Sequence, residues 1–73
     1  MTLLGVLAMP DHKFHIGQIV SYLPALRRVD APSGAYTVTA RLPQAEDGQF
    51  EYRIKHSAEQ NERTAKESEL RAM

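Results

Sequence analysis

Two stretches of the chain alternate between apolar and polar residues as half-buried strands do. In QFEYRIK, residues 49–55, the apolar side chains of Phe50, Tyr52 and Ile54 are separated by charged ones. In YTVTARL, residues 36–42, apolar side chains again occupy every second position. Successive side chains of a strand point to opposite faces, so both stretches are predicted to be strands that bury one face. The pattern therefore predicts an all-β domain.

A further strand is predicted earlier in the chain, over residues 18–23, where the alternation continues until Pro24 interrupts it. Residues 24–35 contain two prolines, a glycine, a serine and an aspartate, which is the composition of a long surface loop. Pro43 is expected to end the strand over residues 36–42, because proline cannot donate a hydrogen bond to a neighbouring strand.

The short loop between the last two of these strands determines how they pair. Both strands are expected to bury their apolar residues on the same face. In that case, the sequence numbers of two directly opposed residues must add up to an even number. A two-residue turn at Asp47 and Gly48 gives an odd sum, whereas a three-residue loop over 46–48, with Gly48 in the left-handed region, gives an even one. The expected pairs are Tyr52 with Leu42, Ile54 with Ala40, Arg41 with Arg53 and Thr39 with Lys55. The alternative is a longer loop with the strand pairing shifted by two residues, which places Arg41 opposite Glu51.

The last segment, residues 57–73, admits two interpretations. Its composition favours a helix. The only sizeable apolar residues in it are Leu70 and Met73, however, so a helix would have almost no apolar stripe to bury. A strand over residues 62–66, followed by a turn over 67–70 that directs Leu70 inward, uses these residues better and is our expectation.

Length and composition limit the chain to one small domain. Its 73 residues leave no room for a second core. The absence of cysteine excludes disulfides and thiolate zinc sites and fits a cytoplasmic protein. The formal net charge of +0 excludes a general electrostatic attraction to nucleic acid or to acidic membranes, so any such binding needs a local patch.

The domain is predicted to span residues 14–71, preceded by residues 1–13. The apolar run over 3–8 lacks a basic leading region and a cleavage site, and it is too short to span a bilayer. We expect residues 1–13 to be a flexible leader or the product of a mis-called start, with Met9 rather than Met1 as the native first residue. The alternative is an extra strand that covers an open edge of the sheet.

The order of several short motifs resembles that of small SH3-like barrel proteins. The motifs are FHIGQIV (14–20), GAYTV (34–38), LPQAEDG (42–48), YRIK (52–55) and RTAKESEL (63–70). Short uncharacterised proteins of alphaproteobacteria share the GxYxV, YRIK and ESEL blocks in the same order. The resemblance implies a small, strongly bent SH3-like barrel of about five short strands, with a short 3-10 turn near the C-terminus. It transfers no functional residue, and the chain departs from the pattern at Ala65, where a larger β-branched residue is expected in the final strand.

No arrangement of residues in the sequence indicates catalysis or a cofactor. His12 and His15 are spaced as metal ligands on a helix, but a strand would place them on opposite faces, and His56 would have to converge on them. The serines lie in no nucleophile motif, and the chain has no glycine-rich phosphate loop. A small barrel also offers no deep pocket. We therefore expect a non-catalytic protein that holds no metal or cofactor and has solvated loop histidines.

Basic residues supply one candidate binding site. Arg41, Arg53 and Lys55 are expected to project from the outer face of the sheet, where they could contact phosphate groups while an exposed aromatic residue, Tyr22 or Phe14, stacks on a base. We favour a simpler interpretation, in which glutamates tether the two arginines and the charged face keeps the sheet soluble. The candidate glutamates are Glu51, Glu59 and Glu62.

A protein or peptide is the other candidate partner. SH3-like barrels bind peptides in a groove between two loops, which here would be residues 24–35 and 44–49, with Tyr22, Tyr36 and Phe50 nearby. The chain has no tryptophan, so it does not resemble the eukaryotic binders of proline-rich peptides. We predict a monomeric, non-catalytic binding module for a protein or peptide. Weak nucleic-acid binding is the alternative function, and self-association through exposed sheet edges is a third.

Overall fold

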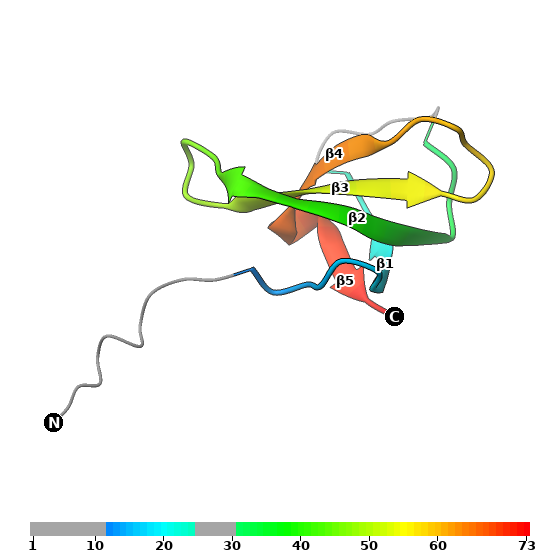
Figure 1. Cartoon of the computed structure of the whole chain (residues 1–73), viewed down its shortest axis with the longest axis horizontal. Coiled ribbons are helices and arrows are strands. Elements are labelled where there is room, and N and C mark those ends of the chain that lie inside the picture. The colour runs from blue at the N-terminus through cyan, green and yellow to red at the C-terminus, as the bar shows by residue number, and fades with distance from the viewer. Residues whose placement is uncertain (1–11, 25–30) are drawn as a thin grey trace, which may run out of the picture.

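The computed structural model describes residues 12–24 and 31–73, which form an antiparallel sheet of five strands with a short 3-10 turn (Figure 1). The elements are β1 (Ile19–Tyr22), β2 (Ala35–Gln44), β3 (Phe50–His56), β4 (Arg63–Lys66), the turn η2 (Glu67–Glu69) and β5 (Leu70–Ala72). The strand order is β4-β3-β2-β1-β5, so β5 returns to pair with β1. The all-β fold, the five strands and the turn near the C-terminus are confirmed.

The sheet is bent but open. Figure 1 shows β2 and β3 as a long twisted hairpin, with β1 and β5 below it. In the described part of the chain, the edge strands β4 and β5 each pair with one neighbour and not with each other. They are only four and three residues long, and η2 joins them directly. The strand pairing therefore does not close the barrel that the resemblance implies.

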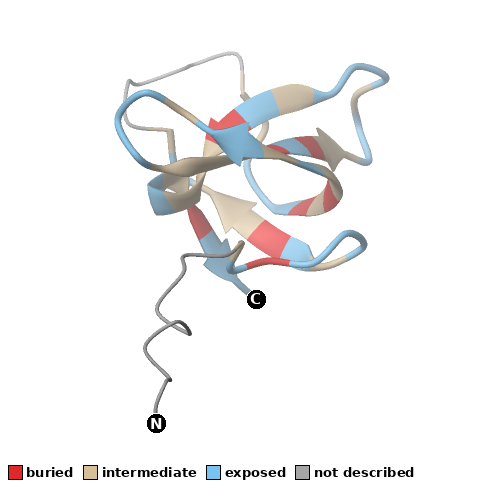
Figure 2. Ribbon diagram, turned by 60° about the vertical axis from the view of Figure 1, so that its left-hand side comes forward, coloured by how far each residue is buried: buried red, intermediate tan, exposed pale blue. Residues whose placement is uncertain are grey.

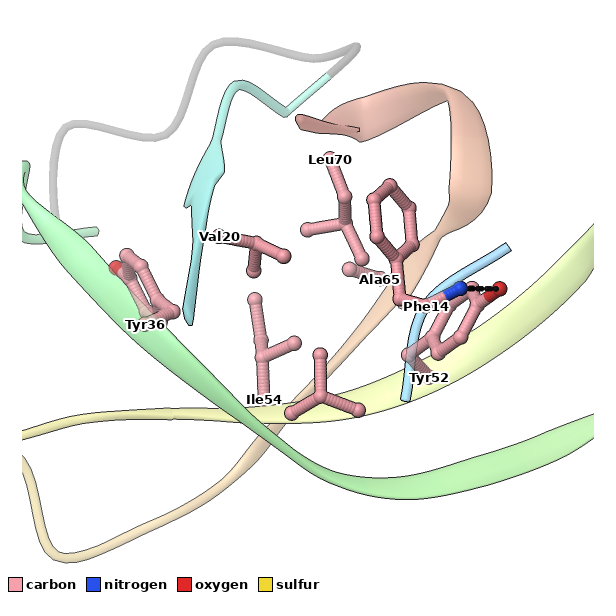
Figure 3. Packing of buried hydrophobic residues seen from close by; sticks show 8 residues of the cluster. Phe14, Val20, Tyr36, Tyr52, Ile54, Ala65 and Leu70 are labelled. Carbon is pink, nitrogen blue, oxygen red and sulfur yellow. Dashed lines mark hydrogen bonds between the residues drawn. The ribbon is translucent and has the colours of Figure 1, made fainter. Parts of the chain in front are cut away.

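Every strand contributes to one apolar core, which also includes a residue from the segment before β1. The buried side chains are Phe14, Val20, Tyr36, Val38, Tyr52, Ile54, Ala65 and Leu70. Figure 3 shows seven of them labelled around a common centre, and Figure 2 shows buried and exposed bands alternating along the strands. Burial of one side chain the size of valine or leucine stabilises a fold by about 1.5–3 kcal/mol. The predicted alternation is thus what encloses the core.

The loop of the β2–β3 hairpin has the predicted form. The Ala45 amide donates to the Gln49 carbonyl over 2.7 Å, and the Gly48 amide donates to the Ala45 carbonyl over 2.9 Å, so residues 46–48 form the loop. Gly48 has a φ of 87°, in the left-handed region where glycine is favoured. The three-residue loop is confirmed.

The register of the same hairpin differs from the prediction. Pairing begins with Gln44 opposite Phe50, as the loop requires, but it then shifts by one residue at each of two bulges. Between Tyr36 and Gln44, the residues of β2 without a Cα partner on β3 are Thr39 and Pro43. The observed pairs are Leu42 with Glu51, Arg41 with Tyr52, Ala40 with Arg53, Val38 with Ile54, Thr37 with Lys55 and Tyr36 with His56. All four predicted pairs are wrong, because the parity argument assumed a strand without bulges.

Pro43 does not end β2, which continues to Gln44. The register shift between Leu42 and Gln44 places Pro43 at a bulge. A proline at a bulge removes no hydrogen bond from the ladder, so the strand tolerates it there. The prediction that this proline terminates the strand is wrong for that reason.

The C-terminal segment forms a strand and a turn rather than a helix. After β4, the Lys66 amide donates to the Glu69 carboxylate over 2.8 Å, and the Leu70 amide donates to the Glu67 carbonyl. Leu70 is then 4% exposed, as the prediction of an inward turn requires. Ala65 lies opposite Tyr52 and is buried, so the smaller residue packs beside a large ring without shortening β4.

The segment before β1 is attached to the sheet from the first described residue. A ring nitrogen of His12 lies 2.6 Å from the Leu42 carbonyl, and the Lys13 amide donates to the Tyr52 hydroxyl over 2.8 Å. The prediction for a start at Met9 falls on residues 1–11, outside the described part of the chain. Of the leader predicted over residues 1–13, only residues 12 and 13 are described, and both contact the sheet. Within the described ranges, no helix has the length and apolar character needed to cross a membrane.

Candidate functional site

An open groove of about 420 Å³ lies on the outer face of β1, β2 and β3, opposite the core. We call it the outer groove. Its lining residues are Ile19, Ala35, Thr37, Thr39, Lys55, His56 and Ser57. Most of them occupy strand positions next to buried residues, so the alternation that fills the core also places them on the outer face.

A row of residues crosses the strands at the outer groove. Ile19 on β1 lies opposite Thr37 on β2, and Thr37 lies opposite Lys55 on β3. The Met73 amide donates to the Ile19 carbonyl over 3.3 Å, which extends the row past the end of β5. The side chains of the row are therefore apolar near β5, carry a hydroxyl group at Thr37 on β2, and are cationic at Lys55 on β3.

Lys55 gives the outer groove its charge. The groove lining includes no carboxylate, and the Lys55 ammonium group makes no ion pair with another described residue. The residue is only partly exposed, so part of its side chain is already ordered against the sheet. A cation in this position is available to an anionic group of a ligand.

His56 forms one wall of the outer groove and is held by two backbone groups. Its Nδ1 accepts a hydrogen bond from the Ala58 amide, and its Nε2 lies 2.9 Å from the Ser33 carbonyl. A carbonyl can only accept, so Nε2 is the donor in its contact with Ser33. The ring also contacts the edge of Tyr36, with centroids 5.0 Å apart. Both nitrogens are therefore engaged, and His56 shapes the groove without offering it a free polar atom.

Only one of the four predicted binding residues lines the outer groove. Lys55 does so, whereas Arg41 and Arg53 lie on the part of the hairpin beyond the bulge at Thr39. Tyr22 lies on β1 opposite Leu70 of β5, with its ring centroid 5.3 Å from that of Tyr36. The prediction that Tyr22 and Phe14 are exposed is wrong, because Tyr22 packs partly buried against the core and Phe14 belongs to it. The four residues are thus distributed over the sheet rather than gathered at one site.

The predicted tethering of the arginines is seen for one of them. The Arg53 guanidinium lies 3.7 Å from the Glu62 carboxylate, with 54% of the arginine side chain exposed. Glu59 instead pairs with Arg63, whose guanidinium lowers the pKa of that carboxyl. Arg41 is exposed and makes no ion pair with another described residue.

The aromatic groove predicted between the two loops does not form. Tyr36 lies opposite His56 and Gln44 lies opposite Phe50, so Tyr36 and Phe50 are at opposite ends of the hairpin. Eight residues of strand separate those ends, a distance on the order of 25 Å. Phe50 packs instead against His12, with ring centroids 4.2 Å apart. Part of the long loop, residues 25–30, lies outside the described residues.

The three histidines occupy separate places. His12 packs against Phe50, His15 lies in the turn before β1, and His56 ends β3. In the described ranges, no three His, Cys, Asp or Glu side chains are grouped so that they could hold a metal ion. His12 is also partly buried, whereas the sequence analysis expected a solvated loop residue.

A second depression, of about 490 Å³, lies beside β5. We call it the β5 depression, and its lining residues are Lys13, Phe14, Glu67, Ser68, Leu70, Arg71 and Ala72. The Tyr52 hydroxyl donates to the carboxylate of Glu67, one of the lining residues, over 2.5 Å and accepts from the amides of Lys13 and Phe14. Figure 3 shows the bond from the Phe14 amide. Burial raises the pKa of Tyr52, and the Glu67 carboxylate raises it further. The polar groups here hold the N-terminal segment to the sheet.

The sequence analysis missed most of the outer groove. Thr37 and Lys55 were assigned to the outer face, but the predicted register did not oppose them. Ile19 was inside the predicted first strand, yet nothing in the sequence indicated that Met73 would extend its row. Comparisons with protein-family models, with curated proteins and with solved structures find no match to this chain.

Proposed function

We propose that this protein is a non-catalytic binding module of SH3-like architecture that recognises a segment of another protein. The strand order, the long connection from β1 to β2 and the turn between β4 and β5 support this architecture. The resemblance to small alphaproteobacterial SH3-like proteins implies about five short strands and a tight turn near the C-terminus, which is consistent with this architecture. An open sheet with short edge strands is compatible with the same arrangement.

The outer groove is the observation that carries the proposal. Protein-binding surfaces combine apolar contact area with hydrogen-bonding groups, and the groove combines Ile19, which is 44% exposed, with threonine and serine hydroxyls. The groove is also open to solvent, so it would not shield a reacting group from water. Recognition is therefore a better use of this surface than catalysis.

Nucleic-acid binding is the second candidate, and the exposed arginines favour it. Arg41 is exposed, and Arg53 keeps more than half of its side chain in solvent despite its contact with Glu62. Such groups can contact phosphates without base specificity. We rank this function second because the arginines lie outside the outer groove, which contains a single cation.

An affinity-capture experiment with the full chain separates the two candidates. The bait is the wild-type protein, a Thr37→Arg variant that fills the outer groove, or a Ser68→Arg variant that places the same side chain in the β5 depression. We expect the wild-type and Ser68→Arg baits to recover the same proteins from lysate, with or without nuclease treatment. The Thr37→Arg bait is expected to lose them.

Two results would overturn the proposal. Equal recovery by all three baits would show that the outer groove takes no part in binding. Recovery that disappears after nuclease treatment, and after Arg41→Glu with Arg53→Glu, would assign the protein to the second candidate function.

A further inference from the structure

We infer that the outer groove binds an extended acidic–apolar peptide segment, in which a carboxylate contacts Lys55 and an apolar side chain contacts Ile19. The inference rests on the proposed function and adds the chemical class of the partner. Charge complementarity, the position of the exposed apolar residues and the spacing between strands each contribute to it.

Charge complementarity assigns the acidic group. Lys55 is the cation of the groove, no carboxylate lines the groove with it, and no described residue forms an ion pair with it. Lys55 is partly exposed, so a ligand in the groove can reach it. Hydrogen bonds between charged partners are shorter and stronger than neutral ones. A ligand with a carboxylate at this point would therefore gain more than a neutral ligand.

Exposed apolar residues at the β5 end of the row indicate that the ligand has an apolar side chain there. Ile19 is 44% exposed and Met73, its neighbour across the β1–β5 ladder, is 72% exposed. Ala35 adds apolar lining on β2. Large apolar side chains exposed side by side on a sheet face are candidates for a contact surface. An apolar ligand side chain over Ile19 and Met73 would remove this surface from water.

Strand spacing sets the distance between the two ligand groups. Ile19, Thr37 and Lys55 lie in one row on three adjacent strands, and neighbouring strands are about 4.8 Å apart. The backbone positions of Ile19 and Lys55 are therefore about 10 Å apart. An extended peptide advances about 3.3 Å per residue, and its side chains alternate between two faces. The acidic and apolar residues of the ligand should therefore be two or four positions apart, because only an even spacing turns both side chains toward the groove.

Hydrogen-bonding groups in the middle of the row can contact the ligand backbone. The hydroxyl groups of Thr37 and Ser57 make no hydrogen bond to another described residue, whereas Thr39 donates to the Arg53 carbonyl over 3.2 Å. His56 has both ring nitrogens engaged. The available groups are thus few, which predicts a weak and short contact rather than a high-affinity interface.

The test is a titration of the isotope-labelled full chain with synthetic peptides, followed by NMR chemical shifts. Two capped peptides carry leucine and glutamate two and four positions apart, and a matched pair carries glutamine instead of glutamate. The peptide of the first pair that binds more tightly is called the first peptide, and its matched control is the glutamine peptide. We expect the first peptide to shift signals of Ile19, Thr37 and Lys55. Both the glutamine peptide and the Lys55→Gln variant should bind about tenfold more weakly, the loss typical of one charge-assisted hydrogen bond. Lys55→Arg should retain binding, and Lys13→Gln, the matched change in the β5 depression, should leave it unchanged.

Each remaining outcome contradicts the inference in a distinct way. Equal affinity for the two peptides, or shifts confined to the β5 depression, would show that Lys55 does not select a carboxylate. If the chemical shifts of the groove residues change with the concentration of the protein alone, the groove binds a second copy of the chain instead. If neither peptide binds while Thr37→Arg still removes captured proteins, the partner class is wrong and the proposed function stands. If Thr37→Arg removes nothing, both are wrong.

Discussion

The two depressions of this protein differ in what their polar groups do. In the β5 depression, the Glu67 carboxylate is bonded to the Tyr52 hydroxyl and to the Lys13 amide, so the acidic group of its lining is used within the fold. The outer groove has no carboxylate in its lining, and Lys55 makes no ion pair with another described residue. The depressions are of similar volume, about 490 and 420 Å³. Size therefore says little about function here, and the two differ in whether a carboxylate is present to balance the basic side chains of the lining.

The largest expected effect comes from an apolar truncation in each depression. Phe14 is 2% exposed, so Phe14→Ala should lower the free energy of unfolding by about 3–5 kcal/mol. Ile19 is 44% exposed, so Ile19→Ala should cost about 1 kcal/mol or less. Urea denaturation followed by circular dichroism measures both. Similar losses for the two variants would contradict the distinction between a structural and a binding region.

Removal of one hydroxyl group from each region should give a smaller difference. Tyr52→Phe leaves the buried Phe14 amide without its acceptor and should cost about 1–3 kcal/mol. The Thr37 hydroxyl makes no hydrogen bond to another described residue, so Thr37→Val should change stability by less than about 0.5 kcal/mol. The same denaturation experiment applies. A Tyr52→Phe variant as stable as the wild type would show that its hydrogen bonds contribute nothing net.

The smallest expected effect is a pH dependence specific to the β5 depression. Burial and the Glu67 carboxylate raise the pKa of Tyr52, so the folded state holds the phenolic proton more tightly than the unfolded chain does. This contribution is complete below the unfolded pKa of about 10 and is lost as the pH rises through the folded pKa. Stability measured between neutral and alkaline pH should therefore fall more steeply in the wild type than in Tyr52→Phe. Parallel curves would contradict the assignment.

The sequence predicted the features of the fold that depend on alternation and on turn chemistry. The three central strands follow from alternating apolar residues, and the loop over 46–48 follows from Gly48. The turn after β4 follows from the need to bury Leu70, which a helix would not satisfy. These predictions needed only local information, and the structure confirms them.

The pairing and the candidate site could not be predicted in the same way. Two bulges in β2 change the register. Thr39 does not indicate a bulge by residue type, and Pro43 is compatible either with a bulge or with the end of the strand. The outer groove depends on that register, because it is what sets Thr37 opposite Lys55. It also depends on the contact of His56 with Ser33, two residues that lie far apart in the sequence. Sequence patterns identified the outer face but not which of its residues meet.

The turn η2 has a consequence for solubility. An open sheet exposes backbone donors at its edges, and such edges allow chains to stack into fibrils by adding strand to strand. The turn engages one backbone amide on each edge strand. The Lys66 amide at the end of β4 donates to the Glu69 carboxylate, and the Leu70 amide at the start of β5 donates to the Glu67 carbonyl. A foreign strand would have to break these bonds before it could align along either edge. The connection that leaves the sheet open thus also hinders its growth into polymers.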